Sequence, residues 1–171
     1  MIKLLVLDVD GVLTDGRKYY GLDGMPFAKT FCDKDFTAIK RAKAAGVHVC
    51  FLSGDNKVNQ AVAKNRNIPF YYSRGIDKSE FLNIFLERFG TTPDEIAYIG
   101  DDLFDIGIMK KVGFKYCTND APEKVKTYCE VLDVAGGQNV VCRLVDHLLK
   151  SKLIPDSTIQ QIEELDKNEK F

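Results

Sequence analysis

The sequence has no excess of either charge, because 24 basic and 25 acidic side chains give a formal net charge of −1. A protein that binds nucleic acid or an anionic membrane along an extended surface needs a basic excess. The chain also lacks any apolar run close to the ~18 residues of a membrane span, and its first residues lack the layout of a secretory signal. We therefore expect a cytoplasmic protein with neither a nucleic acid nor a membrane as partner.

Cysteine occurs without the spacings that mark zinc sites or disulfide frameworks. The five cysteines are odd in number and widely spaced, and no CxxC pair occurs. We interpret them as scattered reduced thiols, most of them buried. The sequence also has no internal repeat and no interdomain linker. With 171 residues, 45% of them hydrophobic, it fits a single globular domain.

Short apolar runs alternate along the chain with longer stretches of helical spacing. Several of the runs are apolar throughout, which is typical of parallel strands buried on both faces. The expected strands are residues 2–8, 47–52, 69–72, 96–100 and 114–117, with 131–134 as a candidate sixth. This alternation predicts an α/β fold, a Rossmann-like open parallel sheet with helices on both faces.

Two segments fall outside the alternation. Residues 16–31 contain two short strand-like stretches around the turn GLDG, which predicts a β-hairpin that projects from the sheet. Residues 155–171 are polar and are expected to form a surface helix or a frayed end. The chain after either of the first two strands is too short for a second folded domain. We therefore expect one domain over residues 1–154, without a separate cap.

Polar side chains follow four of the expected strands, where ligands bind in an open parallel sheet. They are Asp8 and Asp10 after the first strand, Ser53 and Gly54 after the second, Lys78 after the third, and Asp101, Asp102 and Asp105 after the fourth. Taken singly, each has an ordinary explanation, such as a helix N-cap, a turn or a solvated surface residue. Their joint occurrence, in this order, predicts one site at a single edge of the sheet.

Acidic groups that meet at a strand end repel one another and are costly to dehydrate unless a cation compensates them. Carboxylates together with a phosphate are ligands that Mg²⁺ prefers. A lysine in the first turn of a helix is unfavourable unless an anion binds beside it. The set therefore indicates metal-assisted phosphoryl transfer, in which one of Asp8 and Asp10 attacks phosphorus and the other acts as general acid and base. Lys78 and Ser53 would offset the negative charge of the transferred group.

The stretches DVDGVLTD, LSGD and GDDLFD, with the lysine between the last two, resemble the four motifs of the haloacid dehalogenase superfamily of phosphatases. The resemblance implies that Asp8 is the nucleophile and that Asp10 is the acid and base. It also implies that these two residues, Asp10 through its carbonyl, bind Mg²⁺ together with Asp101. The resemblance further implies that Ser53, Gly54 and Lys78 hold the phosphoryl group. It implies that Asp102 and Asp105 orient the metal ligands without binding the metal directly.

Within the superfamily, the layout resembles the small capless branch of octulosonate 8-phosphate and nonulosonate 9-phosphate phosphatases. The shared features are GVLTDG, the hairpin, the spacing from Phe31 to Asp35, GDDLxD and a late Gly-Gly. The resemblance implies a small phosphorylated sugar acid as substrate, with Asp35 and Asp55 near it. It also implies a homotetramer in which the hairpin of one subunit covers a neighbouring active site.

Three positions depart from the octulosonate enzymes. Phe36 stands where those enzymes usually have Gly, Asp55 stands where they have Arg, and Asn139 replaces the last Gly of the late GGxG. An acidic Asp55 would repel a sugar carboxylate, although it could accept hydrogen bonds from hydroxyl groups. The departures leave the phosphatase motifs intact and leave the identity of the substrate open.

Other functions also stay open. A non-catalytic assembly domain, of the kind fused to some acylneuraminate cytidylyltransferases, would be expected to have lost Asp8, Asp10 or Lys78, and none is lost. A phosphatase for macromolecules would suit a capless site, but the hairpin would crowd its entrance in a tetramer. A phosphomutase would normally need a cap to retain its intermediate. Hydrolysis of a small phosphomonoester is the favoured interpretation.

Overall fold

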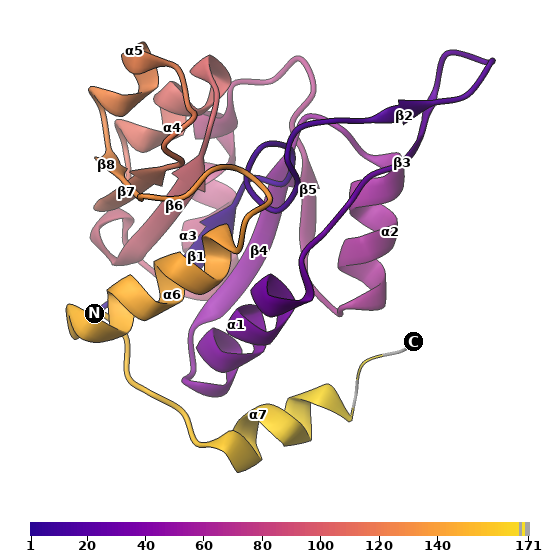
Figure 1. The fold of residues 1–171 in the computed structure, drawn as a ribbon. Helices are drawn as coiled ribbons and strands as arrows, with labels where there is room; N and C mark the ends of the chain where they lie inside the picture. The colour runs from indigo at the N-terminus through magenta and orange to yellow at the C-terminus, as the bar shows by residue number, and fades with distance from the viewer. Residues whose placement is uncertain (168, 170–171) are drawn as a thin grey trace.

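Six parallel strands form the central sheet of the computed structural model, which describes residues 1–167 and 169 (Figure 1). The strand order across the sheet is β5-β4-β1-β6-β7-β8. The strands are β1 (Leu4–Leu7), β4 (His48–Ser53), β5 (Phe70–Tyr72), β6 (Ile96–Gly100), β7 (Phe114–Cys117) and β8 (Glu130–Val131). The predicted parallel sheet is confirmed, and the candidate sixth strand is present as two residues at one edge.

Helices cover both faces of the sheet, as the alternation of the sequence predicts. One face packs against α1 (Asp33–Ala44), α2 (Lys57–Asn65) and α6 (Val140–Lys150). The other packs against α3 (Leu82–Phe89), α4 (Ile106–Met109) and α5 (Glu123–Lys126). Short 3₁₀ helices complete the connections, namely η1 (Lys78–Phe81), η2 (Pro93–Glu95) and η3 (Leu103–Asp105). In the described part of the chain, no helix has the length and apolar character to cross a membrane.

The central strand β1 explains why its sequence is apolar throughout. Leu5 and Leu7 point into the layer of α1 and α6, while Leu4 and Val6 point into the layer of α3 and α4, and all four are fully buried. Strands β4 and β6 flank β1 in parallel register. Because both faces and both edges of β1 are covered, polar side chains are excluded until the strand ends.

The predicted hairpin is present and projects away from the sheet (Figure 1). Its strands are β2 (Tyr19–Tyr20) and β3 (Pro26–Ala28), paired antiparallel. Most of its large apolar side chains are exposed: Tyr20 is 61% exposed, Phe27 65%, and Leu22 at the tip fully so. Such a concentration of exposed apolar surface on a projecting arm is unusual for a surface that only meets water.

The C-terminal segment forms α7 (Ile159–Asp166), which lies along α1 at the opposite end of the molecule from the hairpin (Figure 1). Ion pairs rather than a buried apolar face hold it there. Lys40 of α1 pairs with Asp166 and, at 3.1 Å, with Glu169. Residues 168, 170 and 171 of the expected polar tail lie outside the described residues.

The strand order places the crevice for a ligand between β1 and β6. From β1 the chain proceeds outward through β4 and β5, and it then returns to the other side of β1 and proceeds outward through β6, β7 and β8. The connections on the two sides therefore diverge beyond the carboxyl ends of β1 and β6. This topological switch point is where open parallel sheets bind their ligands.

Candidate active site

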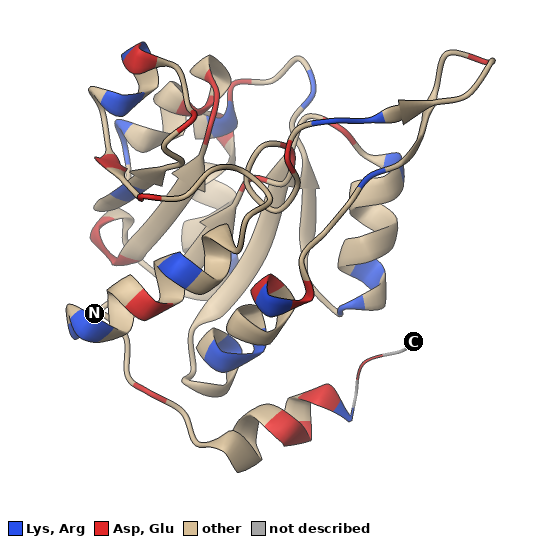
Figure 2. Ribbon diagram, viewed as in Figure 1, with Lys and Arg blue, Asp and Glu red and all other residues tan. Residues whose placement is uncertain are grey.

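A cavity of about 940 Å³ opens at this switch point. Its wall includes nine of the ten residues that the sequence analysis predicts for the site: Asp8, Asp10, Ser53, Gly54, Asp55, Lys78, Asp101, Asp102 and Asp105. Only Asp35 is missing from the wall. Figure 2 shows acidic residues at this end of the strands and basic residues at the base of the hairpin.

Lys78 joins the two acidic clusters at the floor of the cavity. Its Nζ lies 2.9 Å from Oδ2 of Asp8 and 2.6 Å from Oδ1 of Asp105, and it donates a hydrogen bond to the Tyr98 hydroxyl at 3.1 Å. Burial alone lowers the pKa of Lys78, but the two carboxylates outweigh burial and raise the pKa above its usual value. The lysine is therefore a fixed positive charge beside Asp8.

Three carboxylates meet above this lysine. Oxygens of Asp8, Asp101 and Asp105 all lie within 4.8 Å of one another. Burial, with the negative charge of neighbouring carboxylates, raises the pKa of Asp101 to about 8. Burial also raises the pKa of Asp8 to about 7, although Lys78 acts in the opposite direction. The buried Oδ1 of Asp101 has no hydrogen-bond partner among the described residues. Hard oxygen donors, crowded negative charge and an unsatisfied carboxylate oxygen together fit a divalent cation.

Gly11 allows the loops after β1 and β6 to approach each other. It adopts a positive φ of 83°, and a Cβ at this position would lie 2.0 Å from Oδ2 of Asp101. Any other residue would therefore displace the Asp101 carboxylate as well as strain the backbone. The glycine of DVDG is thus required by the closeness of the two acidic loops.

Asp105 shapes the loop that carries Asp101. Its Oδ2 accepts hydrogen bonds from the backbone N–H groups of Asp101 and Asp102, both at 2.9 Å, and its Oδ1 accepts one from Tyr98 at 2.5 Å. Its side chain is fully buried. Asp102, in contrast, is exposed and caps η3 through the N–H of Leu103. Asp102 and Asp105, which the sequence analysis expects in the same supporting role, therefore have different surroundings.

Asp10 is held by two residues that the sequence analysis does not single out. Lys29 Nζ lies 2.7 Å from Asp10 Oδ1, and Asn59 Nδ2 donates a hydrogen bond to Asp10 Oδ2 at 2.9 Å. Asn59 also donates to the hydroxyl of Ser53 at 2.9 Å, which ties the ends of β1 and β4 together. Lys29 follows the hairpin and Asn59 lies on α2, so nothing in the local sequence of either residue marks its partner.

Asp55 is neutralised by the hairpin. Its Oδ2 lies 2.8 Å from Lys29 Nζ and 2.9 Å from Lys18 Nζ. Burial would raise the pKa of Asp55, but hydrogen bonds from Lys29 and Lys18 lower it to about 2. The acidic residue that departs from the pattern of the resembling enzymes therefore anchors both ends of the hairpin at the carboxyl edge of the sheet.

Asp35 is placed differently from the prediction. It is fully buried on α1, and its Oδ1 accepts a hydrogen bond from the backbone N–H of Cys142 at 2.9 Å, in the first turn of α6. Burial raises the pKa of Asp35 to about 6 against the lowering effect of hydrogen bonds from Cys142 and Val141. A carboxylate is favourable at a helix N-terminus. Asp35 therefore joins α1 to α6, and the predicted contact with substrate is replaced by this capping role.

The other two departures from the family pattern also lie away from the cavity wall. Phe36 is buried in the core, with the guanidinium of Arg66 4.1 Å from its ring centre. Asn139 takes the left-handed conformation, with φ of 65°, that a glycine would adopt at the start of α6, and asparagine tolerates this conformation. Of the three departures, only Asp55 reaches the site.

We predict that Lys29→Met destabilises the protein by about 2 kcal/mol, because Asp10 and Asp55 lose the buried cation they share. Urea unfolding followed by circular dichroism measures the effect. Lys34→Met, at an exposed position of α1, is the matched control and is expected to change stability by less than about 0.5 kcal/mol. Equal stability of the two variants would contradict the assignment of Lys29 as the anchor of the hairpin.

Comparison with known proteins agrees with this geometry. A sequence profile of haloacid dehalogenase-like hydrolases matches residues 55–135. The 3-deoxy-D-manno-octulosonate 8-phosphate phosphatase of Salmonella typhi is 34% identical over 150 residues, which cover 86% of this chain and 79% of that protein. The enzyme of the same name from Haemophilus influenzae is 31% identical and covers 88% of this chain and 84% of its own.

Solved structures show the same likeness. The cobalt-bound form of the Haemophilus influenzae phosphatase has a TM-score of 0.83 at 31% identity and covers 88% of this chain and 89% of its own. The Moraxella catarrhalis octulosonate phosphatase, solved with magnesium, phosphate and a KDO molecule, has a TM-score of 0.80 at 27% identity and covers 88% and 87%. The chain therefore belongs to the haloacid dehalogenase-like hydrolases, and it is a capless phosphatase similar to the octulosonate 8-phosphate phosphatases.

Proposed function

We propose that this phosphatase hydrolyses the phosphomonoester of a small sugar acid, of the octulosonate 8-phosphate or nonulosonate 9-phosphate type, with Mg²⁺ and through an aspartyl-phosphate on Asp8. The observation that carries the proposal is the buried Asp8–Lys78 pair beside Asp101 at the switch point of the sheet. The substrate class is supported by the relatives, whose names state an octulosonate 8-phosphate as their substrate.

In the first step, a carboxylate oxygen of Asp8 attacks phosphorus, and the bond from phosphorus to the substrate oxygen breaks. Asp10 donates a proton to the departing alcohol. In the second step, Asp10 takes a proton from water, the water oxygen attacks phosphorus, and the bond from phosphorus to Asp8 breaks. The products are the free sugar acid and inorganic phosphate, and Asp8 and Asp10 return to their starting states.

The chain's own residues reduce the repulsion between the anionic nucleophile and the anionic phosphoryl group. Lys78 provides a fixed positive charge 2.9 Å from Asp8, and Ser53 and Gly54 line the same cavity. The side chains of Asp8 and Asp101, with the carbonyl of Asp10, would hold Mg²⁺. When bound, the ion would neutralise charge on the phosphoryl oxygens and on the acidic cluster.

The hairpin supports the further proposal of a homotetramer in which each arm covers a neighbour's site. Tyr20, Leu22 and Phe27 expose apolar surface on the arm, and Leu103 and Phe104 expose apolar surface on the cavity wall, at 49% and 80%. Burial of both patches together would exclude water from the site and remove the exposed apolar area. A monomer in solution would leave the cavity open and would favour a macromolecular phosphate as substrate.

The proposal predicts Mg²⁺-dependent release of phosphate from sugar acid phosphates. The assay compares octulosonate 8-phosphate, nonulosonate 9-phosphates and a phosphopeptide, each with Mg²⁺ and with EDTA. We expect kcat/KM to be highest for one sugar acid and to fall by at least about 10³-fold in EDTA, since the acidic cluster would then lack its counter-ion. Preferred hydrolysis of the phosphopeptide would contradict the proposed substrate, and release without any metal would contradict the proposed mechanism.

A further inference from the structure

Three cations line the cavity, and two of them are already paired with carboxylates. Lys78 pairs with Asp8 and Asp105, and Lys18 pairs with Asp55 at 2.9 Å. The third, Arg74, has no hydrogen bond or ion pair with any residue in the described part of the chain. A guanidinium without a partner among the described residues, on the wall of the cavity proposed to bind a phosphate ester, is available to an anionic ligand.

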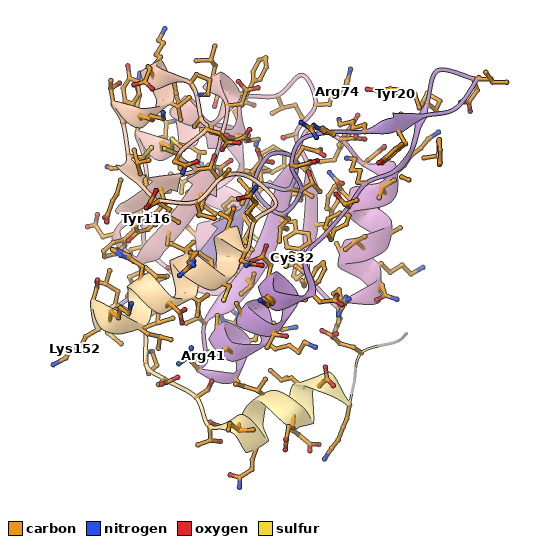
Figure 3. The ribbon with its side chains drawn as sticks, in the orientation of Figure 1. Tyr20, Cys32, Arg41, Arg74, Tyr116 and Lys152 are labelled. Atoms are coloured by element: carbon orange, nitrogen blue, oxygen red, sulfur yellow. The ribbon has the colours of Figure 1, made fainter. Side chains whose placement is uncertain are left out.

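The loop between β5 and η1 fixes the position of Arg74 at the rim. The N–H of Ser73 donates to the carbonyl of Ser53 at 2.9 Å, and the N–H of Ile76 donates back to the carbonyl of Ser73 at 3.0 Å. The backbone just before Arg74 is therefore tied to the end of β4, and the backbone after it turns back onto Ser73, while the side chain of Arg74 is exposed. Figure 3 labels Arg74 at the top of the molecule, on the side from which the hairpin projects.

We infer that Arg74 binds the carboxylate of the substrate and thereby determines the preference of this enzyme for a sugar acid; the inference rests on the proposed function. Asp8 and Lys78 are buried on the cavity wall, where the phosphoryl group would react, and Arg74 is an exposed residue of the same wall, where the other end of the substrate would lie. A guanidinium matches a carboxylate through two parallel hydrogen bonds. It also adds positive charge to a wall whose other charged residues are mostly acidic.

The same assignment resolves the difficulty raised by Asp55. An unpaired acid in place of the arginine of related enzymes would repel a sugar carboxylate, but Asp55 is paired with both Lys18 and Lys29. Asp55 is therefore no obstacle to an acidic substrate. Arg74 supplies a positive charge from a different strand end, so the site can bind a carboxylate even though the family's arginine is missing.

The test compares two substrates that differ only in the carboxylate, gluconate 6-phosphate and glucitol 6-phosphate, beside octulosonate 8-phosphate. In Arg74→Met, we expect KM for the two acids to rise about 10- to 100-fold, as for loss of a hydrogen-bonded ion pair. We expect kcat for the acids to fall less than threefold, and kcat/KM for glucitol 6-phosphate to change less than twofold. Arg74→Lys, which keeps the charge but loses the paired hydrogen bonds, is expected to recover part of the loss.

Arg143→Met, at an exposed position of α6 away from the cavity, is the control and is expected to match the wild type. An equal loss on acid and neutral substrates would overturn the inference, because Arg74 would then bind the phosphoryl group. An unchanged KM for the acids would also overturn it. In both cases the wild-type activity would leave the proposed function standing. A wild type that hydrolyses neither these three esters nor a nonulosonate 9-phosphate would instead overturn the proposed function, and the inference with it.

Discussion

Asp8→Asn is expected to lower phosphatase kcat by at least about 10⁴-fold, because an amide cannot form the acyl phosphate. The fold should be retained. The Asn side chain can still accept the hydrogen bond that the N–H of Val9 donates to Oδ1 of Asp8 at 2.7 Å, and Lys78 keeps Asp105 as its counter-ion. The measurements are phosphate release, thermal unfolding, and acid-quench trapping of labelled phosphate on the protein, which only the wild type should show.

Asp15→Asn is the matched control, since Asp15 belongs to the same motif but is exposed. It is expected to keep activity within about threefold of the wild type, as surface substitutions usually do. Appreciable turnover by Asp8→Asn, or labelled phosphate on the variant protein, would show that another residue is the nucleophile.

Lys78→Met is expected to lower kcat by about 10²- to 10³-fold, the effect of removing one fixed charge from a transition state. The structure adds a second consequence. Burial already raises the pKa of Asp8 to about 7 against the influence of Lys78, so loss of the lysine raises that pKa further. Since Asp8 must be ionised to attack, the acidic limb of the pH–rate profile should move to higher pH, and part of the loss should be recovered there.

Lys111→Met serves as the control, because Lys111 bonds to Ser79 of η1 at 3.0 Å but has no ion pair with the acidic cluster. The pH–rate profile of this variant should match that of the wild type. If Lys78→Met raised KM and left kcat and the pH profile unchanged, Lys78 would only bind substrate and would not stabilise the reacting charge.

The sequence predicted most of the fold because its signals are local. The run of four apolar residues in β1 is buried on both faces, and this burial depends only on the period of the strand and its apolar character. The location of the site could be predicted in the same way, because the carboxyl ends of parallel strands meet at one edge of the sheet. Asp8, Lys78 and Asp101 could therefore be expected at one site before any contact was known.

The partners of these residues could not be predicted, since they come from positions far apart in the chain. Lys29 and Asp55 form an ion pair although they are 26 residues apart in the sequence. Lys78 and Tyr98 form a hydrogen bond although they are 20 residues apart. A hydrogen bond between such groups depends on where the hairpin and the helices pack, and no periodicity in the sequence records that. The position of Asp35 could not be predicted for the same reason. The Phe31–Asp35 spacing suggested that Asp35 lies near the substrate, but α1 packs against α6, and Asp35 caps α6 instead.

The sequence by itself determined the parallel sheet, the projecting hairpin and the set of acidic residues and lysine at the strand ends, because hydrophobic period and strand direction are sufficient for these. Only the tertiary structure decided which charges are compensated. Packing brings Lys18 and Lys29 onto Asp55 and leaves Arg74, on the wall of the cavity, without a partner among the described residues. The balance of charge in the site depends on distances of about 3 Å between distant segments, and such distances exist only once the chain has folded.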